Sequence, residues 1–353
     1  MMIDKYFCLS SYLAFRFIWK EGVDFVDGFQ HKNFVPLNEC KRIPVVTSED
    51  IDREIGRQFD ALYKKYDNIG ILLSGGMDSA ILASYLKPGS HAYTFCSDTG
   101  EFDADIRRAK IYCNKWNLNH HMINITMDDY MKYTPTVMHF KFAPVHSIEP
   151  QIYKAAEIAK SDGVQLMIVG ESADLIFGGM DKLISPHWTF ETFKKRYTFL
   201  DPFLVLNKPI DQSALFEKYR IGTNGNDHMK FMDEVFSIES SGSYMNAFSA
   251  AWLPYYDPYA CLKMAEPLDM ELVRNGQPKY LVRGLYSIKY PELEVPFKIP
   301  MPRPVDSVFR NWEGPKRKEF RSDIPLYSLT GNQKWQLWCA EKFLDLLDNN
   351  HHF

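Results

Sequence analysis

The sequence predicts an α/β protein in which a parallel β-sheet is followed by a mostly helical C-terminal region. An apolar strand, Ile71-Leu72-Leu73, leads directly into a glycine turn and then into an apolar helix that begins near Ala80. Further strands alternate with helices up to about residue 169. Because strands that alternate with helices form βαβ units, this order predicts a parallel sheet. The other predicted strands span residues 91–96, 120–125 and 165–169, and the helices between them span residues 103–116 and 150–162.

Three regions follow from this pattern. Residues 1–46 form a small N-terminal segment, and residues 47–188 form the α/β domain. The domain opens with a helix, because Thr47 and Asp50 stand three residues apart like the members of a capping box. Residues 189–353 form a mostly helical region that we expect to pack on the domain. Its predicted helical segments are 190–220, 227–237, 243–264, 279–290 and 333–348.

Composition limits the possible classes of function. The 353-residue chain carries 46% hydrophobic and 24% charged residues, which is typical of a soluble globular protein. Its net charge of −4 provides no basic field for nucleic acid, and no apolar run reaches the ~18 residues of a membrane span. The six cysteines are scattered without a Cys-x-x-Cys pair, so they fit neither a zinc site nor a disulfide framework. We therefore expect a cytoplasmic protein with neither nucleic-acid nor membrane partners.

Residues 70–79, Gly-Ile-Leu-Leu-Ser-Gly-Gly-Met-Asp-Ser, form the most informative motif. Glycines let the backbone approach an anion closely and adopt a positive φ. The helix that follows offers its unpaired N–H groups and its dipole to a phosphate. Asp78 would repel a bare phosphate, but it suits a phosphate that carries Mg²⁺. The turn therefore predicts a site for a metal-chelated polyphosphate; the alternative is a simple helix cap.

This turn differs from two common nucleotide loops. It lacks the Gly-Lys-Ser/Thr ending of a Walker A loop, and Gly75-Gly76 lacks the spaced third glycine of the dinucleotide fingerprint. It is similar to Ser-Gly-Gly-x-Asp-Ser, the pyrophosphate loop of the ATP pyrophosphatases. The resemblance implies a parallel-sheet ATP-pyrophosphatase domain. It also implies that ATP is cleaved between its α and β phosphates while a substrate is adenylated.

A second motif, Gly170-Glu171-Ser172-Ala173-Asp174-Leu175-Ile176-Phe177-Gly178-Gly179, follows the strand at 165–169. Glu171 and Asp174 share one face if a helix begins here. Ligands bind beyond the carboxyl ends of parallel strands, so both acids would lie above the same sheet edge as Asp78. Two carboxylates there suit Mg²⁺ on a pyrophosphate, and a third suits proton transfer. The alternative is that these acids only complement the dipole of a helix N-terminus.

Together the two motifs resemble the asparagine synthetase family, which also includes the β-lactam and carbapenam synthetases. That family carries Ser-Gly-Gly-x-Asp-Ser and Gly-Glu-x-x-Asp-x-x-Phe-Gly-Gly, and the resemblance covers roughly residues 48–304. Pro254-Tyr255-Tyr256-Asp257 is similar to its Pro-Phe-Leu-Asp, and Lys279-Tyr280-Leu281-Val282-Arg283 to its Lys-x-x-Leu-Arg. Lys298 stands where the family has its catalytic lysine.

The resemblance implies a role for each matched residue. Asp78 and Asp174 would bind Mg²⁺, and Glu171 would act as the general base or orient the incoming amine. Lys298 would stabilise negative charge on the adenylate and on the tetrahedral intermediate; the alternative is a solvated loop lysine. The residues that would hold the β,γ-pyrophosphate of ATP are Ser74, Gly75, Gly76, Asp78 and Ser79. The residues that would frame the adenine and ribose are Leu72, Leu73, Thr94 and Gly170.

Three departures limit the resemblance. Complete asparagine synthetases begin with a glutaminase domain whose nucleophile is the cysteine exposed after removal of Met1. Here Met2 follows Met1, and the segment before the turn is too short for that domain, so glutamine hydrolysis is not expected. Leu175 replaces an acid that is common in the second motif. Residues 144–151 lack the arginine that an aspartate-binding site of this family would contain, and Glu149 would repel an aspartate carboxylate. For His146 two roles stay open: it would contact the substrate, or it would cap the next helix.

We therefore expect an ATP-dependent, AMP-forming carbon–nitrogen ligase of the asparagine synthetase type. It would adenylate a small-molecule carboxylate, release pyrophosphate, and transfer ammonia or an amine to the acyl group. Ammonia would come from solution or from a separate glutaminase. Two alternatives remain open at this point: a nucleoside- or tRNA-modifying enzyme that uses the same loop, and a non-catalytic nucleotide-binding module. The sequence names neither the acceptor nor the amine source.

Overall fold

A computed structural model describes residues 2–96, 103–180, 188–296 and 303–349. At its centre is a five-stranded sheet with the order β10-β7-β4-β5-β6, and every neighbouring pair is parallel. The strands are β4 (Ile69–Leu72), β5 (His91–Cys96), β6 (Asn119–Asn124), β7 (Leu166–Ile168) and β10 (Tyr255–Tyr256). The predicted parallel α/β fold is confirmed.

The central strands are buried on both faces. Successive residues of a strand point to opposite sides, so Leu72 and Met167 belong to one hydrophobic core and Ile71 and Ile168 to another. Strands covered on both faces read as continuous apolar runs, which is why β4 lacks polar alternation. Helices α5 (Met127–Lys141), α6 (Glu149–Ser161) and α13 (Ser237–Ala250) contribute to the first core. Helices α2 (Ser48–Leu62), α3 (Met77–Ala83), α4 (Asp103–Trp116) and α15 (Tyr280–Lys289) contribute to the second.

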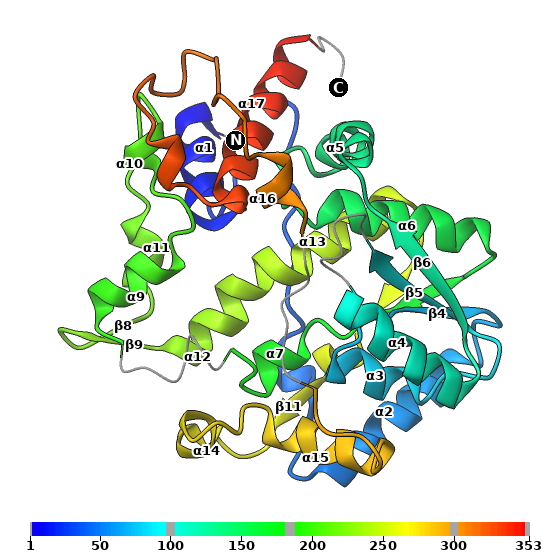
Figure 1. Cartoon of the computed structure of the whole chain (residues 1–353). Helices are drawn as coiled ribbons and strands as arrows, with labels where there is room; N and C mark the ends of the chain where they lie inside the picture. The colour runs from blue at the N-terminus through cyan, green and yellow to red at the C-terminus, as the bar shows by residue number, and fades with distance from the viewer. Residues whose placement is uncertain (1, 97–102, 181–187, 297–302, 350–353) are drawn as a thin grey trace.

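The two ends of the described chain meet in the first core. Figure 1 shows α1 (Lys5–Phe15, blue) beside α17 (Gly331–Asn349, red). The Gln336 side chain donates a hydrogen bond to the Leu13 carbonyl at 3.0 Å. The Phe25 and Phe343 rings pack edge-on, with 4.9 Å between their centroids. The aromatic N-terminal segment is therefore core structure.

The sheet gains a strand that the sequence did not predict. Residues 243–264 were expected to be one helix, but α13 ends at Ala250 and Trp252 takes a left-handed backbone conformation with φ 54°. Pro254 and Pro258 lack the N–H groups that a continuing helix needs. Strand β10 therefore forms beside β7, and β11 (Leu262–Met264) pairs with β3 (Ile43–Val45).

The expected helix at 190–220 is also broken, into α9 (Phe190–Tyr197), α10 (Pro202–Val205) and α11 (Ser213–Glu217). Helices α9 and α11 pack in a third, largely aromatic cluster that includes Phe193, Phe216 and Phe231, whereas Val205 of α10 belongs to the first core. No helix in the described ranges is both long and apolar enough to cross a bilayer. The remaining elements are β1 (Met2–Ile3), β2 (Val23–Asp24), η1 (Glu39–Lys41), α7 (Ala173–Ile176), β8 (Arg220–Ile221), β9 (Gly225–Asn226), α12 (His228–Phe231), η2 (Met232–Phe236), η3 (Tyr259–Cys261), α14 (Met270–Arg274), α16 (Val305–Val308) and η4 (Leu326–Ser328).

We predict that Phe343→Ala lowers the free energy of unfolding by about 3–5 kcal/mol, because it leaves a cavity in the first core. Phe343 is 1% exposed, whereas the control Ile288 on α15 is 47% exposed. Ile288→Ala is expected to change stability by less than about 0.5 kcal/mol. Urea unfolding followed by circular dichroism measures both values. A Phe343→Ala effect as small as the control would show that α17 does not belong to the core.

Candidate active site

The glycine turn between β4 and α3 lies at the carboxyl edge of the sheet. Gly75 has a φ of +73°, and a Cβ atom there would lie 2.5 Å from the carbonyl oxygen of Asp105. Only glycine fits this position without strain. The Ser79 hydroxyl accepts a hydrogen bond from the Ser74 N–H at 3.2 Å and lies 3.1 Å from the Ser74 hydroxyl. Its own serines thus hold the turn in shape, and Ser74 stays exposed.

Helix α4 supports this turn from the side. The Arg108 Nε donates to the Gly75 carbonyl at 2.8 Å, and its Nη2 donates to the Asp105 carboxylate at 2.6 Å. Burial raises the pKa of Asp105 despite the opposing effect of Arg108. The same pair therefore limits the space at Gly75 and anchors its carbonyl, which fixes the backbone of the turn.

The first residue of the second motif, Gly170, packs against the glycine turn and the helix that follows it. A Cβ atom on Gly170, just beyond β7, would lie 3.2 Å from Leu82 Cδ1 and 3.6 Å from the carbonyl carbon of Asp78. The hydroxyl of Tyr259 donates to the Asp78 carbonyl at 3.1 Å and belongs to a side chain with no exposure. Both motifs are therefore part of one packed unit at the sheet edge.

Asp257 orders the loop of the second motif. It follows β10, and its carboxylate accepts hydrogen bonds from the Ser172 N–H at 2.7 Å and the Tyr259 N–H at 3.0 Å. Burial raises the pKa of Asp257 to about 6, although these hydrogen bonds favour the carboxylate. The Pro-Tyr-Tyr-Asp match in the sequence thus corresponds to a residue that supports the second motif.

Lys279 joins the two acidic motifs. Its ammonium lies 2.6 Å from the Asp78 carboxylate and 2.7 Å from the Asp174 carboxylate. The Lys279 side chain is only 5% exposed. Burial disfavours its charged form, but the attraction of Asp174 and Asp78 is stronger and raises the pKa of Lys279. Two carboxylates that are distant in the sequence therefore share one buried cation.

The local backbone makes room for this ion pair. Lys279 has a left-handed backbone conformation with φ 54° and stands just before α15. A Cβ atom on Gly179 would lie 2.0 Å from the Asp174 Oδ1 atom and 2.7 Å from Lys279 Cδ. The final glycine of the second motif is therefore required by the close approach of Asp174 and Lys279.

Glu171 lies half-buried at the same edge. Burial, followed by repulsion from Asp174 and Asp257, raises the pKa of Glu171 to about 7. The Ser240 and Tyr244 side chains lie close enough to interact electrostatically with its carboxyl group. A carboxyl group with a pKa near neutrality can both accept and return a proton at physiological pH.

A cationic cluster lies next to this carboxyl group. An Arg16 nitrogen donates to Glu239 at 2.9 Å and lies 2.9 Å from His146 Nε2. The Arg303 guanidinium donates to Asn332 at 3.3 Å, and its buried Nε has no hydrogen-bond partner in the described part of the chain. Burial and the neighbouring Arg16 lower the pKa of Arg303. Two guanidinium groups thus face one carboxylate, and an anion would complete their pairing.

The expectation that Glu149 would repel an acceptor carboxylate is wrong. Glu149 has no exposure, and its carboxylate binds the Lys141 ammonium at 3.1 Å, the His146 N–H at 2.7 Å and the Asn246 amide. The His146 Nδ1 accepts from the Ile148 N–H at 3.1 Å, one residue before α6 begins. Its other ring nitrogen faces Arg16 and Glu239, so this histidine connects the helix to the cationic cluster.

The residues expected to frame adenine and ribose lie at the sheet edge but are mostly buried. Leu72, Leu73 and Thr94 are exposed by 8%, 1% and 2%. The Thr94 hydroxyl donates to the Leu73 carbonyl at 2.8 Å, which positions the end of β4. Their nucleotide role, like that of Gly170, stays a prediction. Lys298 lies outside the described residues.

The donor set fits Mg²⁺ and a polyphosphate. Asp78 and Asp174 each place an oxygen within 2.7 Å of the same cationic group. Mg²⁺ is typically bound by one or two carboxylates together with phosphate oxygens. The turn at Gly75 and Gly76 lies beside these acids at the start of α3, where a phosphate would be favoured.

Sequence reasoning missed four residues of this region. Lys279 lay inside a family-like motif, so it could have been assigned a role. Tyr244 had no such signal within α13. Arg16 and Arg303 come from the two ends of the described chain, and only folding places them together near Glu171.

Comparisons with known proteins identify one family and several relatives that match only part of the chain. The asparagine synthase family model matches residues 59–264, more than half of the chain. An asparagine synthetase (glutamine-hydrolysing) of Sandersonia aurantiaca is 31% identical over 125 residues, which cover 31% of this chain and 23% of the relative. Asparagine synthetase 2 of Oryza sativa is 28% identical over 125 residues, which cover 31% of this chain and 21% of the relative. The match therefore spans under a quarter of each relative's length.

Two solved structures also overlap with the chain. One is an NMN synthetase from Francisella tularensis, with 13% identity, a TM-score of 0.28, and coverage of 72% of this chain and 99% of that one. The other is a U34-tRNA thiolase from Methanococcus maripaludis, with 14% identity, a TM-score of 0.24, and coverage of 71% and 83%. These TM-scores are too low to carry an argument.

The raised pKa of Glu171 predicts a pH-dependent stability. The folded protein binds this proton more tightly than the unfolded chain, so the free energy of unfolding falls as the pH rises from about 4.5 to about 7. Glu171→Gln removes this titration. As the pH rises through that range, the free energy of unfolding of the variant should therefore rise by on the order of 1–3 kcal/mol relative to that of the wild type. Urea unfolding curves at the two ends of the range measure the gain, and a constant difference would contradict the assignment.

Proposed function

This chain belongs to the asparagine synthase family, and we propose that it is an ATP-dependent ligase that forms an amide bond. It would transfer AMP from ATP to a carboxylate, release pyrophosphate, and then replace AMP with ammonia or an amine. One observation carries the proposal: Lys279 joins Asp78 of the glycine turn to Asp174 of the second motif within 2.7 Å.

The first half-reaction needs a charged polyphosphate to be held and oriented. The turn at Ser74, Gly75 and Gly76 and the start of α3 suit the β,γ-phosphates. Asp78 and Asp174 would hold Mg²⁺, which when bound neutralises charge on the leaving pyrophosphate. The buried Lys279 ammonium adds a fixed positive charge in a site that excludes water, where such charges are most effective.

The second half-reaction needs a base for the incoming amine. Glu171 has a pKa of about 7, and it lies beside the acids that would hold the pyrophosphate. An ammonium ion that approaches this carboxylate would lose a proton to it and attack the acyl adenylate as a neutral amine. Tyr244 and Ser240 lie close to the carboxyl group and would help to orient it.

The acceptor carboxylate would enter from the cationic cluster of Arg16 and Arg303. Both arginines lie outside the residues that match the family model, and Tyr244 links their surroundings to Glu171. An acceptor with a second anionic group would suit two neighbouring guanidinium groups of which only Arg16 forms an ion pair with Glu239 in the described part of the chain. Ammonia would come from solution or from a separate glutaminase.

The alternative of a nucleoside- or tRNA-thiolating enzyme fits the chain less well. Such chemistry uses reactive thiolates, but burial raises the pKa of Cys113 and Cys339 to about 12. The net charge of −4 offers no general attraction to RNA. A non-catalytic nucleotide-binding module would not need a carboxyl group with a near-neutral pKa beside the phosphate site.

We predict that Asp78→Asn and Lys279→Gln each reduce carboxylate-dependent ATP–pyrophosphate exchange at least ~100-fold, because both groups stabilise charge on the phosphates. Lys64→Gln, which changes an exposed lysine of the same charge, is the control and should retain full exchange. Radiolabelled pyrophosphate and a panel of mono- and dicarboxylic acids provide the assay. Exchange that survives Asp78→Asn would refute the proposed site.

Glu171→Gln separates the two half-reactions. The variant should retain the pyrophosphate exchange, because glutamine keeps the size of the side chain and the phosphate ligands stay in place. Amide formation should fall by about 100- to 10,000-fold, because the base is lost. Mass spectrometry of the amide product and the exchange assay on the same preparation measure both steps. If both steps fall equally, Glu171 serves adenylation rather than amine transfer.

A further inference from the structure

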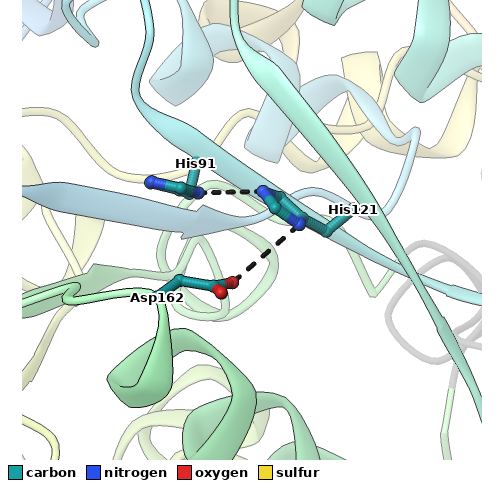
Figure 2. A group of neighbouring side chains, drawn as sticks. All are labelled: His91, His121 and Asp162. Carbon is teal, nitrogen blue, oxygen red and sulfur yellow. Dashed lines mark hydrogen bonds and ion pairs between the residues drawn. The ribbon is translucent and has the colours of Figure 1, made fainter.

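A second cluster of metal-ligating side chains lies at the opposite edge of the sheet from the glycine turn. His91 is the first residue of β5, His121 lies on β6, and Asp162 is the C-cap of α6. Figure 2 shows the three side chains converging between the two strands and the end of the helix. The cluster shares no residue with the candidate active site.

The three side chains are close enough to bind one ion. His91 Nδ1 and His121 Nε2 face each other at 2.8 Å, and His121 Nδ1 lies 3.9 Å from Asp162 Oδ2. One possible ligand atom from each residue lies within 4.8 Å of the other two. Tetrahedral zinc with bonds of about 2.0–2.2 Å separates its ligands by about 3.3 Å. Changes in the distances between ligand atoms of about 0.5 to 1.5 Å would therefore bring the ligands into place.

The surrounding structure holds these rings in position. Tyr93 pairs with His121 across the strands, and its ring stacks on the His121 ring at 4.9 Å between centroids. The Tyr93 hydroxyl donates to Asp162 Oδ2 at 2.8 Å, and burial together with Asp162 raises the pKa of Tyr93. Metal-binding carboxylates are typically oriented by a hydrogen bond from a neighbouring side chain, as Asp162 is by the Tyr93 hydroxyl.

We propose that His91, His121 and Asp162 bind one divalent transition-metal ion of the zinc class. Two imidazole nitrogens and one carboxylate oxygen suit Zn²⁺, Ni²⁺ or Cu²⁺ and are a poor set for Mg²⁺. The ion takes the place of the proton that lies between the two ring nitrogens, and the imidazole that donates it changes tautomer, so that the proton moves to the other nitrogen of the same ring. His121 and Asp162 are about one-third exposed, so the ion has a route from solution and a water molecule can complete its coordination.

The bound ion would connect three parts of the chain. It would link β5 and β6 to the turn that leads from α6 into β7, at the amino ends of these strands. Because ligating imidazoles must be neutral, protons compete with the ion for these side chains. The site does not depend on the proposed ligase activity.

The test measures binding of Zn²⁺ and Co²⁺ to the full-length chain. His351 and His352 near the C-terminus are replaced by alanine in every protein, so that they contribute no binding. In this background, isothermal titration with ZnCl₂ at about pH 7.5 should show one tight site. His121→Ala and the milder His91→Gln should each weaken that site at least ~10-fold. His139→Ala on the exposed face of α5 is the matched control and should bind like the parent.

Co²⁺ absorption gives an independent readout. The parent should show the visible bands of a tetrahedral or five-coordinate site, and His91→Gln should lose them while its circular dichroism stays unchanged. The proposal is overturned if the parent binds neither ion, or if binding and spectrum persist unchanged in both cluster variants. Loss of binding in His139→Ala as well would also overturn it, because the binding would then not depend on this cluster.

Discussion

The candidate active site depends on one interaction, the buried contact of Lys279 with Asp78 and Asp174. Two carboxylates at this spacing would repel each other in a partly buried place. The ammonium between them removes that repulsion, and its raised pKa reflects the same attraction. The interaction also joins three segments: the turn after β4, the motif after β7, and the start of α15. Any rearrangement that moved one segment would leave a buried charge without its partner.

The parallel sheet makes this interaction possible. Because all five strands run the same way, the loops that follow β4, β7 and β10 leave from one edge. Asp78, Glu171 and Asp257 therefore gather there, and repulsion from Asp174 and Asp257 adds to burial in raising the pKa of Glu171. Asp257 accepts hydrogen bonds from the backbone N–H groups of Ser172 in the second motif and of Tyr259, so this acid supports the loop that follows β7.

The family-like part of the chain holds the acids, whereas the ends of the described chain supply the arginines. Arg16 and Arg303 lie outside residues 59–264, and each reaches the vicinity of Glu239. The packing of α1 against α17 brings these ends together. The acidic motifs thus lie inside the family match, whereas the two arginines belong to segments that the match does not include.

The sequence by itself determined four of the five strands of the sheet, the glycine turn and the two acidic motifs, because these depend on local periodicity and on the backbone freedom of glycine. It also predicted that Asp78 and Asp174 would share one sheet edge. It failed for β10, since two tyrosines between prolines carry no strong strand signal. It gave no sign that His91 and His121 meet, or that Glu149 is neutralised by Lys141. Only the tertiary structure decided these contacts and the place of Lys279, because side chains far apart in the chain have no periodicity that records their pairing.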